Sequence, residues 1–219
     1  MHDLIVPTFG LPPHTAVAIY LSLGLVVIAI LNRNRLAIVP GKLQNIVEMV
    51  FETFLLLSED MMGHHGKKYV PFILSFFIYI LIANAFGMVP GLIPPTANLN
   101  TTVGLALIVF ISTHIIGVKE HGLKYFKRFA GPSPFLAPLM IPIEVVGHMV
   151  RPFSLSMRLF ANMMGHEIVS GMLLILMPLG YPLLAFSTVL GIIVVIIQAT
   201  VFSLLAMAYI GGAVEEEEH

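Results

Sequence analysis

Long apolar stretches separated by short polar segments dominate this sequence. Runs over about residues 14–31, 71–89 and 103–118 have close to the length that crosses a bilayer, which takes about 20 apolar residues. Two longer runs follow, over about 138–176 and 183–213, joined by a proline- and glycine-containing turn at 178–182. Helices of this length measure roughly 45 Å or more, whereas the bilayer core is about 30 Å thick. We therefore expect the last two helices to be strongly tilted.

One further segment, at about 44–61, has a different pattern. Gln44, Glu48, Glu52 and Glu59 recur at helical spacing, with apolar residues on the other faces. This pattern is typical of an amphipathic helix that lies at the membrane interface, because a spanning helix would carry its carboxylates into hydrocarbon. The sequence predicts an all-α membrane protein with about five membrane-crossing helices and one interfacial helix, in a single integral membrane domain over residues 1–219.

Composition agrees with the hydropathy pattern. Hydrophobic residues make up 58% of the 219 residues and charged residues only 11%, against roughly 25% charged in soluble domains, and mean hydropathy is +0.95. A net charge of −1 does not suggest a nucleic-acid partner, and the lack of cysteine excludes disulfides and thiolate metal sites. We expect no metal and no cofactor. The first 15 residues contain no lysine or arginine, unlike a secretory signal, so we expect the first apolar run to be retained.

The basic residues predict the orientation. They cluster between the first two predicted spans and after the third: Arg33, Arg35, Lys42, Lys67 and Lys68, then Lys119, Lys124, Lys127 and Arg128. Loops rich in lysine and arginine stay on the cytoplasmic side. Both clusters are therefore predicted to be cytoplasmic, with the N-terminus outside and the C-terminus inside.

A polar stripe runs along the predicted helix over 138–176, with Arg158 near its middle. At about 100° per residue, four side chains fall within about 40° of Arg158, His148 and His166 lie about 80° away, and Glu167 points to the opposite side; the four are Glu144, Arg151, Ser154 and Asn162. Arginine at a bilayer centre costs about 2.5–3.5 kcal/mol on insertion scales. It cannot release its proton, but it favours the ionised form of a nearby carboxylate.

No carboxylate on this face is an obvious partner for Arg158. Glu144 lies roughly 21 Å away along an ideal helix. The sequence therefore indicates a carboxylate supplied by another chain. The last predicted helix has a weaker stripe, comprising Ser187, Gly191, Gln198 and Tyr209, and Gln198 is placed to hydrogen-bond across to the Arg158 helix.

These motifs resemble subunit a, the stator proton-channel subunit of the rotary F-type ATP synthase. The similar segments are PIEVVGHMVRPFSLSMRLFANMMGHE at 142–167, IIQATVFSLLAMAYI in the last helix and NAFGMVPG at 84–91. The resemblance implies that Arg158 faces the carboxylates of a rotating ring of c subunits, with Asn162 and Gln198 beside it. Glu144, Ser154 and Glu167 then line two aqueous half-channels. His166 stands where many bacterial members have glycine, and Gly191 where some have histidine, which suggests one imidazole in the same space.

The resemblance also implies partners and location. The partners are the c ring, b-type peripheral-stalk subunits, the rest of the ATP synthase complex and the lipid bilayer, in a bacterial plasma (inner) membrane. The coupling ion is expected to be the proton, and sodium remains the alternative. No P-loop is present, so nucleotide chemistry belongs to other subunits.

Simpler interpretations stay open for single residues. Arg158 could anchor the helix by snorkelling, Glu144 and Arg151 could form a helix-stabilising pair, and His166 could serve packing alone. Glu167, Asn84 and Gln198 could be interhelical hydrogen-bonding groups. Among whole-protein alternatives, a solitary transporter or channel would need its own substrate cavity. An intramembrane metallopeptidase would need a second histidine after His166-Glu167, which Ser170 does not supply.

Overall fold

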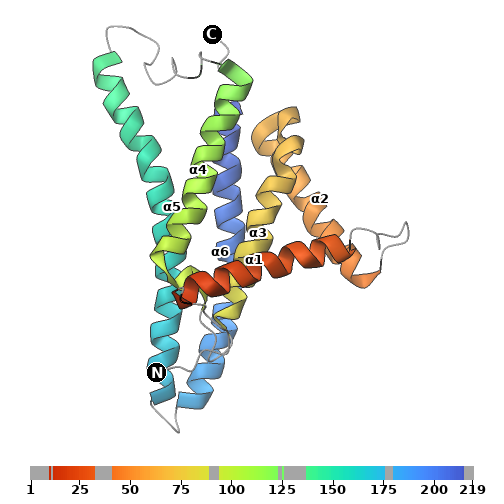
Figure 1. Cartoon of the computed structure of the whole chain (residues 1–219), viewed down its shortest axis with the longest axis vertical. Coiled ribbons are helices and arrows are strands. Elements are labelled where there is room, and N and C mark those ends of the chain that lie inside the picture. The colour runs from red at the N-terminus through yellow and green to blue at the C-terminus, as the bar shows by residue number, and fades with distance from the viewer. Residues whose placement is uncertain are drawn as a thin grey trace.

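The computed structural model describes residues 10, 12–32, 41–88, 94–122, 125, 137–175 and 180–214. Its helices, in chain order, are α1 (Pro13–Asn32), α2 (Lys42–Met62), η1 (Gly63–Tyr69), α3 (Val70–Phe86), η2 (Pro95–Ala97), α4 (Leu99–His121), α5 (Ala137–Ile175) and α6 (Gly180–Val214), where η denotes a 3₁₀-helix. Figure 1 shows their arrangement. The described residues contain no strand, and the predicted all-α membrane class is confirmed.

Four segments of the described chain are long and apolar enough to cross a membrane. They are Pro13–Leu31, Gly66–Phe86, Leu99–His121 and Ala185–Val214. These segments overlap four of the five predicted spans. The fifth predicted span is the helix α5, which is not among them and which carries the polar stripe.

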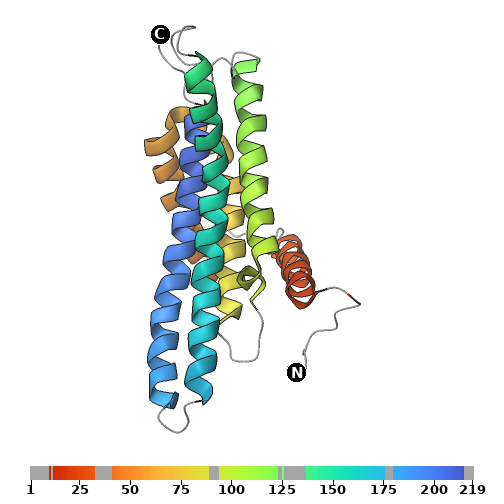
Figure 2. The same cartoon turned by 90° about the vertical axis from the view of Figure 1, so that its left-hand side faces the viewer.

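The two longest helices run side by side along the long axis of the molecule. Both α5, with 39 residues, and α6, with 35, would measure more than about 50 Å at 1.5 Å per residue. Figures 1 and 2 show α1 running across the direction of this pair. The tilt of this pair relative to a bilayer stays a prediction. Two prolines, Pro142 and Pro152, are accommodated inside α5; interior prolines are tolerated more readily in membrane helices.

The core forms where α3 packs against α6. Ile73 and Ile80 of α3 and Phe202 of α6 are fully buried, and the rings of Phe76 and Phe202 stack with centroids 6.0 Å apart. Lipid tails are as apolar as these side chains, so close packing rather than transfer from water holds such helices together. The α3–α6 contact therefore supplies a fixed support for the helices around it.

The amphipathic helix α2 docks on both core helices. Phe54 is buried, and its ring lies 5.0 Å from that of Phe77 on α3. On α6, a Cβ atom at Gly211 would lie 3.0 Å from the carbonyl oxygen of Met61, so the end of α2 closely approaches α6. The exposed face of α2 mixes Ile46 and other apolar residues with carboxylates. Its interfacial location stays a prediction.

The bundle has two distinct ends. At one end, Nζ of Lys68 lies 2.9 Å from Oε1 of Glu120, which joins η1, directly before α3, to the end of α4. At the other end, Nδ1 of His14 lies 3.3 Å from the carbonyl oxygen of Pro94, which places the start of α1 beside η2. The contact between Lys68 and Glu120 and the contact between His14 and Pro94 thus lie at different ends of the bundle.

Several helix boundaries differ from the prediction. The helix α4 begins at Leu99 rather than at 103, because the side chain of Asn98 accepts a hydrogen bond from the backbone N–H of Asn100 and caps the helix. The helix α3 ends at Phe86, earlier than the predicted 89. The helix α6 begins at Gly180, inside the predicted 178–182 turn. Pro182 is compatible with this start, because the first helical turn needs no intrahelical N–H donor.

Candidate functional site

The helix α5 divides the predicted polar stripe between two environments. A row of apolar residues at helical spacing, Leu155, Leu159 and Met163, is buried against the rest of the bundle. This row fixes the rotation of α5. As a result Ser154, Arg158 and Asn162 are exposed, whereas Arg151 and His148 are half-buried.

Arg158 is exposed on the long helix α5. In the part of the chain that the structure describes, no carboxylate lies within ion-pair distance of its guanidinium group. Large apolar side chains are exposed on both long helices; they include Met172 on α5 and Ile193 and Ile197 on α6. The arrangement is a cation on an apolar surface, which is unfavourable in lipid unless an anion approaches.

A direct hydrogen bond joins the two long helices one turn beyond Arg158. Nδ2 of Asn162 donates to Oε1 of Gln198 at 2.7 Å. Gln198 is buried while Asn162 is exposed, so the bond connects the bundle interior to the Arg158 surface. The predicted contact between Gln198 and the Arg158 helix is confirmed.

His166 packs directly on Gly191. A Cβ atom at Gly191 would lie 2.6 Å from Nε2 of His166 and 2.6 Å from Sδ of Met88, so no larger residue fits without movement. Nδ1 of His166 lies 3.4 Å from Oγ of Ser170. The expectation that one imidazole fills the space between these two positions is confirmed. The neighbouring Glu167 is exposed.

A second polar cluster lies nearer the Glu120 end of the bundle. Nε2 of His148 lies 3.3 Å from Oε1 of Glu144, one turn earlier on α5. The guanidinium carbon of Arg151 lies 5.5 Å from the ring centroid of Tyr209 on α6. The structure therefore pairs Glu144 with His148 and Arg151 with Tyr209, and it does not show the alternative pair of Glu144 with Arg151.

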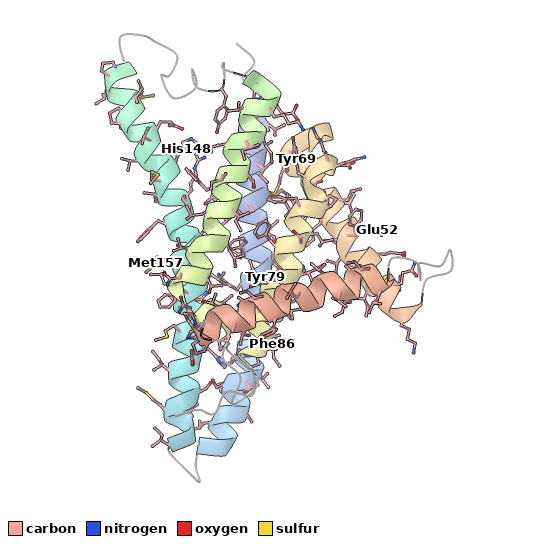
Figure 3. All side chains as sticks on the ribbon, viewed as in Figure 1. Glu52, Tyr69, Tyr79, Phe86, His148 and Met157 are labelled. Atoms are coloured by element: carbon pink, nitrogen blue, oxygen red, sulfur yellow. The ribbon has the colours of Figure 1, made fainter. Side chains whose placement is uncertain are left out.

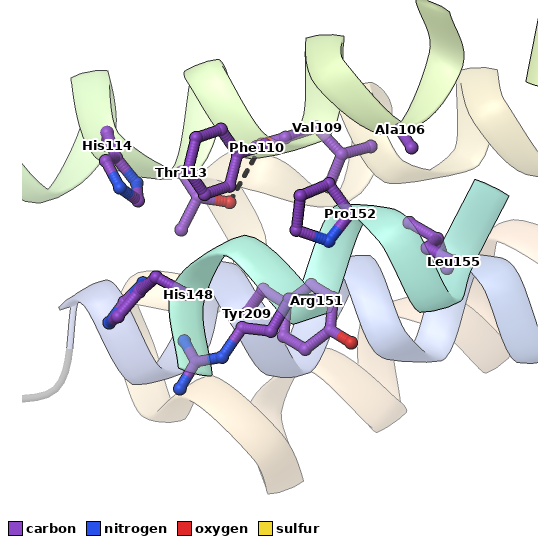
Figure 4. Close-up of a pocket in the computed structure, with 10 residues that line it drawn as sticks. All are labelled: Ala106, Val109, Phe110, Thr113, His114, His148, Arg151, Pro152, Leu155 and Tyr209. Atoms are coloured by element: carbon purple, nitrogen blue, oxygen red, sulfur yellow. Dashed lines mark hydrogen bonds between the residues drawn. The ribbon is translucent and has the colours of Figure 1, made fainter. Parts of the chain in front are cut away.

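The sequence pattern does not predict that His114 belongs to this cluster. The rings of His114 on α4 and His148 lie 5.4 Å apart in an edge-to-face arrangement. Figure 4 shows both histidines, Arg151 and Tyr209 around one pocket between α4, α5 and α6. His114 lies inside an apolar segment whose pattern predicts a helix but not its neighbours. Its polarity in such a segment is the one sequence feature that singles it out.

Asn84 takes part in a buried hydrogen bond rather than in the α5–α6 surface. Both Asn84 and Thr96 are fully buried, and Oγ1 of Thr96 donates to Oδ1 of Asn84 at 2.7 Å. The bond ties α3 to η2, so the interpretation of Asn84 as an internal hydrogen-bonding group is confirmed. Within the described residues, no group of three or more histidines and carboxylates is placed to hold a metal ion.

Comparison with known proteins extends over almost the whole chain. The family model described as ATP synthase A chain matches residues 14–211. The chain is 49% identical over 208 residues to ATP synthase subunit a 1 of Syntrophotalea carbinolica, covering 95% of this chain and 88% of the relative. It is 48% identical over 192 residues to ATP synthase subunit a of Geotalea uraniireducens (88% and 83%), and 46% identical over 192 residues to that of Geobacter sulfurreducens (88% and 83%). With this coverage, and with the resembling motifs all inside the matched region, the chain belongs to the ATP synthase A chain family.

Proposed function

We propose that this chain is the stator subunit of the membrane sector of ATP synthase, in which Arg158 meets carboxylates of a rotating ring of c subunits. Family membership makes the chain a membrane-sector, proton-translocating component of that complex, with no catalytic site of its own. The alternatives of a solitary transporter and an intramembrane peptidase are thereby set aside. The single observation that carries the finer proposal is the exposed, unpaired position of Arg158 within the described chain.

The surroundings of Arg158 support a moving partner. A fixed internal acid would neutralise the guanidinium permanently, whereas a carboxylate on another chain can arrive, ionise and leave. The apolar residues exposed on α5 and α6 suit a ring of small apolar helices, and a protonated carboxylic acid can cross the adjoining lipid without a charge penalty. The same proposal includes b-type peripheral-stalk subunits and the surrounding bilayer as partners.

Polar residues on either side of Arg158 are suited to two separate half-channels. Glu144 lies roughly 21 Å before it along α5, on the side of Ser154, and Glu167 roughly 14 Å after it, beside His166. Asn162 and Gln198 form a polar link between Arg158 and the second group. Because arginine keeps its proton, it separates the two groups and prevents a continuous proton path between them.

The mechanism follows from these charges. A proton enters one half-channel and neutralises a ring carboxylate, which can then face lipid. After rotation, a carboxylate that reaches Arg158 is favoured in its ionised form, and its proton leaves through the other half-channel. A membrane potential contributes about 2.3 kcal/mol per proton per 100 mV. Rotation then drives nucleotide chemistry in the other subunits.

The two ends of the bundle support a definite orientation. Lys68, Lys119 and Glu120 lie at the end where α4 and α6 terminate (Figure 1). Under the positive-inside rule this end is cytoplasmic, and the end with His14 and Pro94 is outside. We place the protein in the bacterial plasma (inner) membrane, with the N-terminus outside and the C-terminus in the cytoplasm.

The test replaces Arg158 in the assembled ATP synthase. Arg158→Ala is expected to abolish ATP-driven proton pumping in inverted vesicles, and Arg158→Lys nearly as completely, because a point charge does not reproduce the planar guanidinium. ATP hydrolysis and the amount of subunit in the membrane serve as assembly controls. Normal pumping by a correctly assembled Arg158→Ala enzyme would refute the proposal.

A further inference from the structure

Two potential metal-ligand atoms approach one point on α6. A Cβ atom at Gly191 would lie 2.6 Å from Nε2 of His166 and 2.6 Å from Sδ of Met88, so the nitrogen and the sulfur lie no farther apart than twice that distance. Met88 follows two residues after Phe86, which ends α3 (Figure 3). Because glycine has no side chain, both atoms border the same small space beside α6.

The nitrogen atom in this space has an unused hydrogen-bonding capacity. Nε2 of His166 is buried, and within the described residues it has no hydrogen-bond partner. The other ring nitrogen, Nδ1, lies 3.4 Å from Oγ of Ser170, one turn later on α5. When Nδ1 carries the ring proton and donates it to this hydroxyl oxygen, Nε2 has a lone pair. A buried acceptor without a donor is unfavourable, and a bound metal ion satisfies it.

The sulfur of Met88 determines which metal ion fits. Thioether sulfur is a soft ligand that selects copper(I), whereas calcium and magnesium need oxygen ligands. Bonds of about 2.1 Å to nitrogen and about 2.3 Å to sulfur, the lengths that zinc makes, join two ligand atoms up to about 4.4 Å apart. The separation that the Gly191 contacts allow includes this value. A structural zinc site would take four ligands, and within the described residues no group of three histidines and carboxylates is placed to supply them.

We propose that His166 and Met88 form a binding site for a soft monovalent metal ion, copper(I), for which silver(I) is a probe of the same charge. The ion binds Nε2 and Sδ while the ring proton stays on Nδ1, so nothing is oxidised or reduced. The bound ion is an inhibitor of proton flow and not a cofactor. Inhibition rests on the proposed function, because it assumes that His166 lies beside a half-channel. The binding itself does not rest on it.

The site lies toward the outside end of the bundle in the proposed orientation. A Cβ atom at Gly87 would lie 3.0 Å from Cβ of Pro94, and Pro94 contacts His14 at that end. Both His166 and Met88 are half-buried, so an ion does not have to cross the packed core to reach them. The ion is therefore expected to enter from the outside, which corresponds to the interior of inverted vesicles.

The first measurement is the affinity of the purified, whole ATP synthase for copper(I), by competition with a coloured copper(I) chelator. Thiols of the other subunits are first blocked with N-ethylmaleimide, which finds no cysteine in this chain. Met88→Leu, which nearly conserves side-chain volume, is expected to lose one ion or bind it at least about tenfold more weakly, since even an outer-shell partner contributes about 10–100-fold to metal affinity. The matched control is Met172→Leu, at an exposed position on α5, which should bind as wild type does.

The second measurement is ATP-driven proton pumping by inverted vesicles that enclose silver(I) in a chloride-free buffer. An impermeant chelator outside the vesicles keeps the catalytic subunits free of metal. Wild type and Met172→Leu are expected to be inhibited. Met88→Leu should pump normally without metal and should need at least about tenfold more silver(I) for the same inhibition, because it lacks one ligand of the site.

The outcomes separate this inference from the proposed function. Equal copper(I) affinity in wild type, Met88→Leu and His166→Gln overturns the site. If Met88→Leu does not assemble, His166→Gln decides by binding alone, since it keeps a polar side chain but lacks the ligand nitrogen. Binding that both variants lose, without inhibition of wild type, keeps the site and overturns the inhibition. Normal pumping by Arg158→Ala refutes the Arg158 mechanism and leaves the binding result as it stands.

Discussion

The amide of Asn162 donates a hydrogen bond of 2.7 Å to Oε1 of Gln198 and so joins the exposed surface of α5 to the buried side of α6. The bond lies one helical turn from Arg158, on the side toward Glu167. It links the two long helices close to the guanidinium group of Arg158. Interhelical bonds of this type contribute about 0.6 kcal/mol each on average, so geometry rather than global stability is the expected readout.

The first prediction concerns this pair. Asn162→Ala and Gln198→Ala are each expected to slow proton pumping severalfold, because each leaves the partner amide without its bond and frees α5 to shift. The double variant is expected to be no slower than the worse single variant, since both changes remove the same interaction. A double-mutant cycle on pumping rates in inverted vesicles measures this. Additive losses would mean that the two residues act independently.

The second prediction uses the contact between His166 and Gly191. Gly191→Ala adds a Cβ atom 2.6 Å from both Nε2 of His166 and Sδ of Met88, so the imidazole must move. Overpacking of this type costs about 1–3 kcal/mol. We expect a lower temperature of thermal inactivation for the purified complex, together with slower pumping.

The matched control and rescue for Gly191 come from the same helices. A Cβ atom at Gly212, also on α6, meets nothing within 4 Å, so Gly212→Ala should leave both properties unchanged. Adding His166→Ala to Gly191→Ala should restore the thermal stability by removing the clashing ring. Failure of that rescue would show that Met88 or the backbone, and not His166, sets the requirement for glycine.

The third prediction concerns the buried bond between Thr96 and Asn84. Thr96→Val keeps the side-chain shape but removes the hydroxyl that donates to Oδ1 of Asn84 at 2.7 Å. An unpaired buried amide costs about 1–3 kcal/mol, so the complex should inactivate at a lower temperature. The matched control is Thr101→Val, at a half-buried position on α4. Equal effects of the two substitutions would mean that the Asn84 bond contributes nothing specific.

The sequence predicted the helices well and their ends less well. Long apolar runs identify α1, α3, α4 and α6, since such patterns leave little choice of structure in a membrane. The start of α4 was missed because it depends on a single capping side chain, Asn98, which sequence alone does not distinguish from a loop asparagine.

For the candidate site, the sequence predicted the stripe along α5 but not its division. Periodicity places Arg151 and Arg158 on one face, yet Arg151 lies over Tyr209 while Arg158 faces outward. That difference depends on where α4 and α6 pack against α5. A helical wheel describes one helix only, so it cannot predict this packing. For the same reason His114 and His148, far apart in the chain, were not expected to share a pocket.

The last prediction distinguishes Glu167 from Arg158. Glu167→Gln is expected to slow proton pumping severalfold without abolishing it, because Glu167 is exposed and water or the adjacent imidazole of His166 can carry protons in its place. Initial pumping rates in inverted vesicles measure the effect, with Glu52→Gln as the control for loss of one exposed carboxylate on α2. Combining Glu167→Gln with His166→Ala removes both titrating groups and should reduce the rate well below that of either single variant. Complete loss in Glu167→Gln alone would make the carboxylate indispensable, and a wild-type rate in the double variant would remove both residues from the proton path.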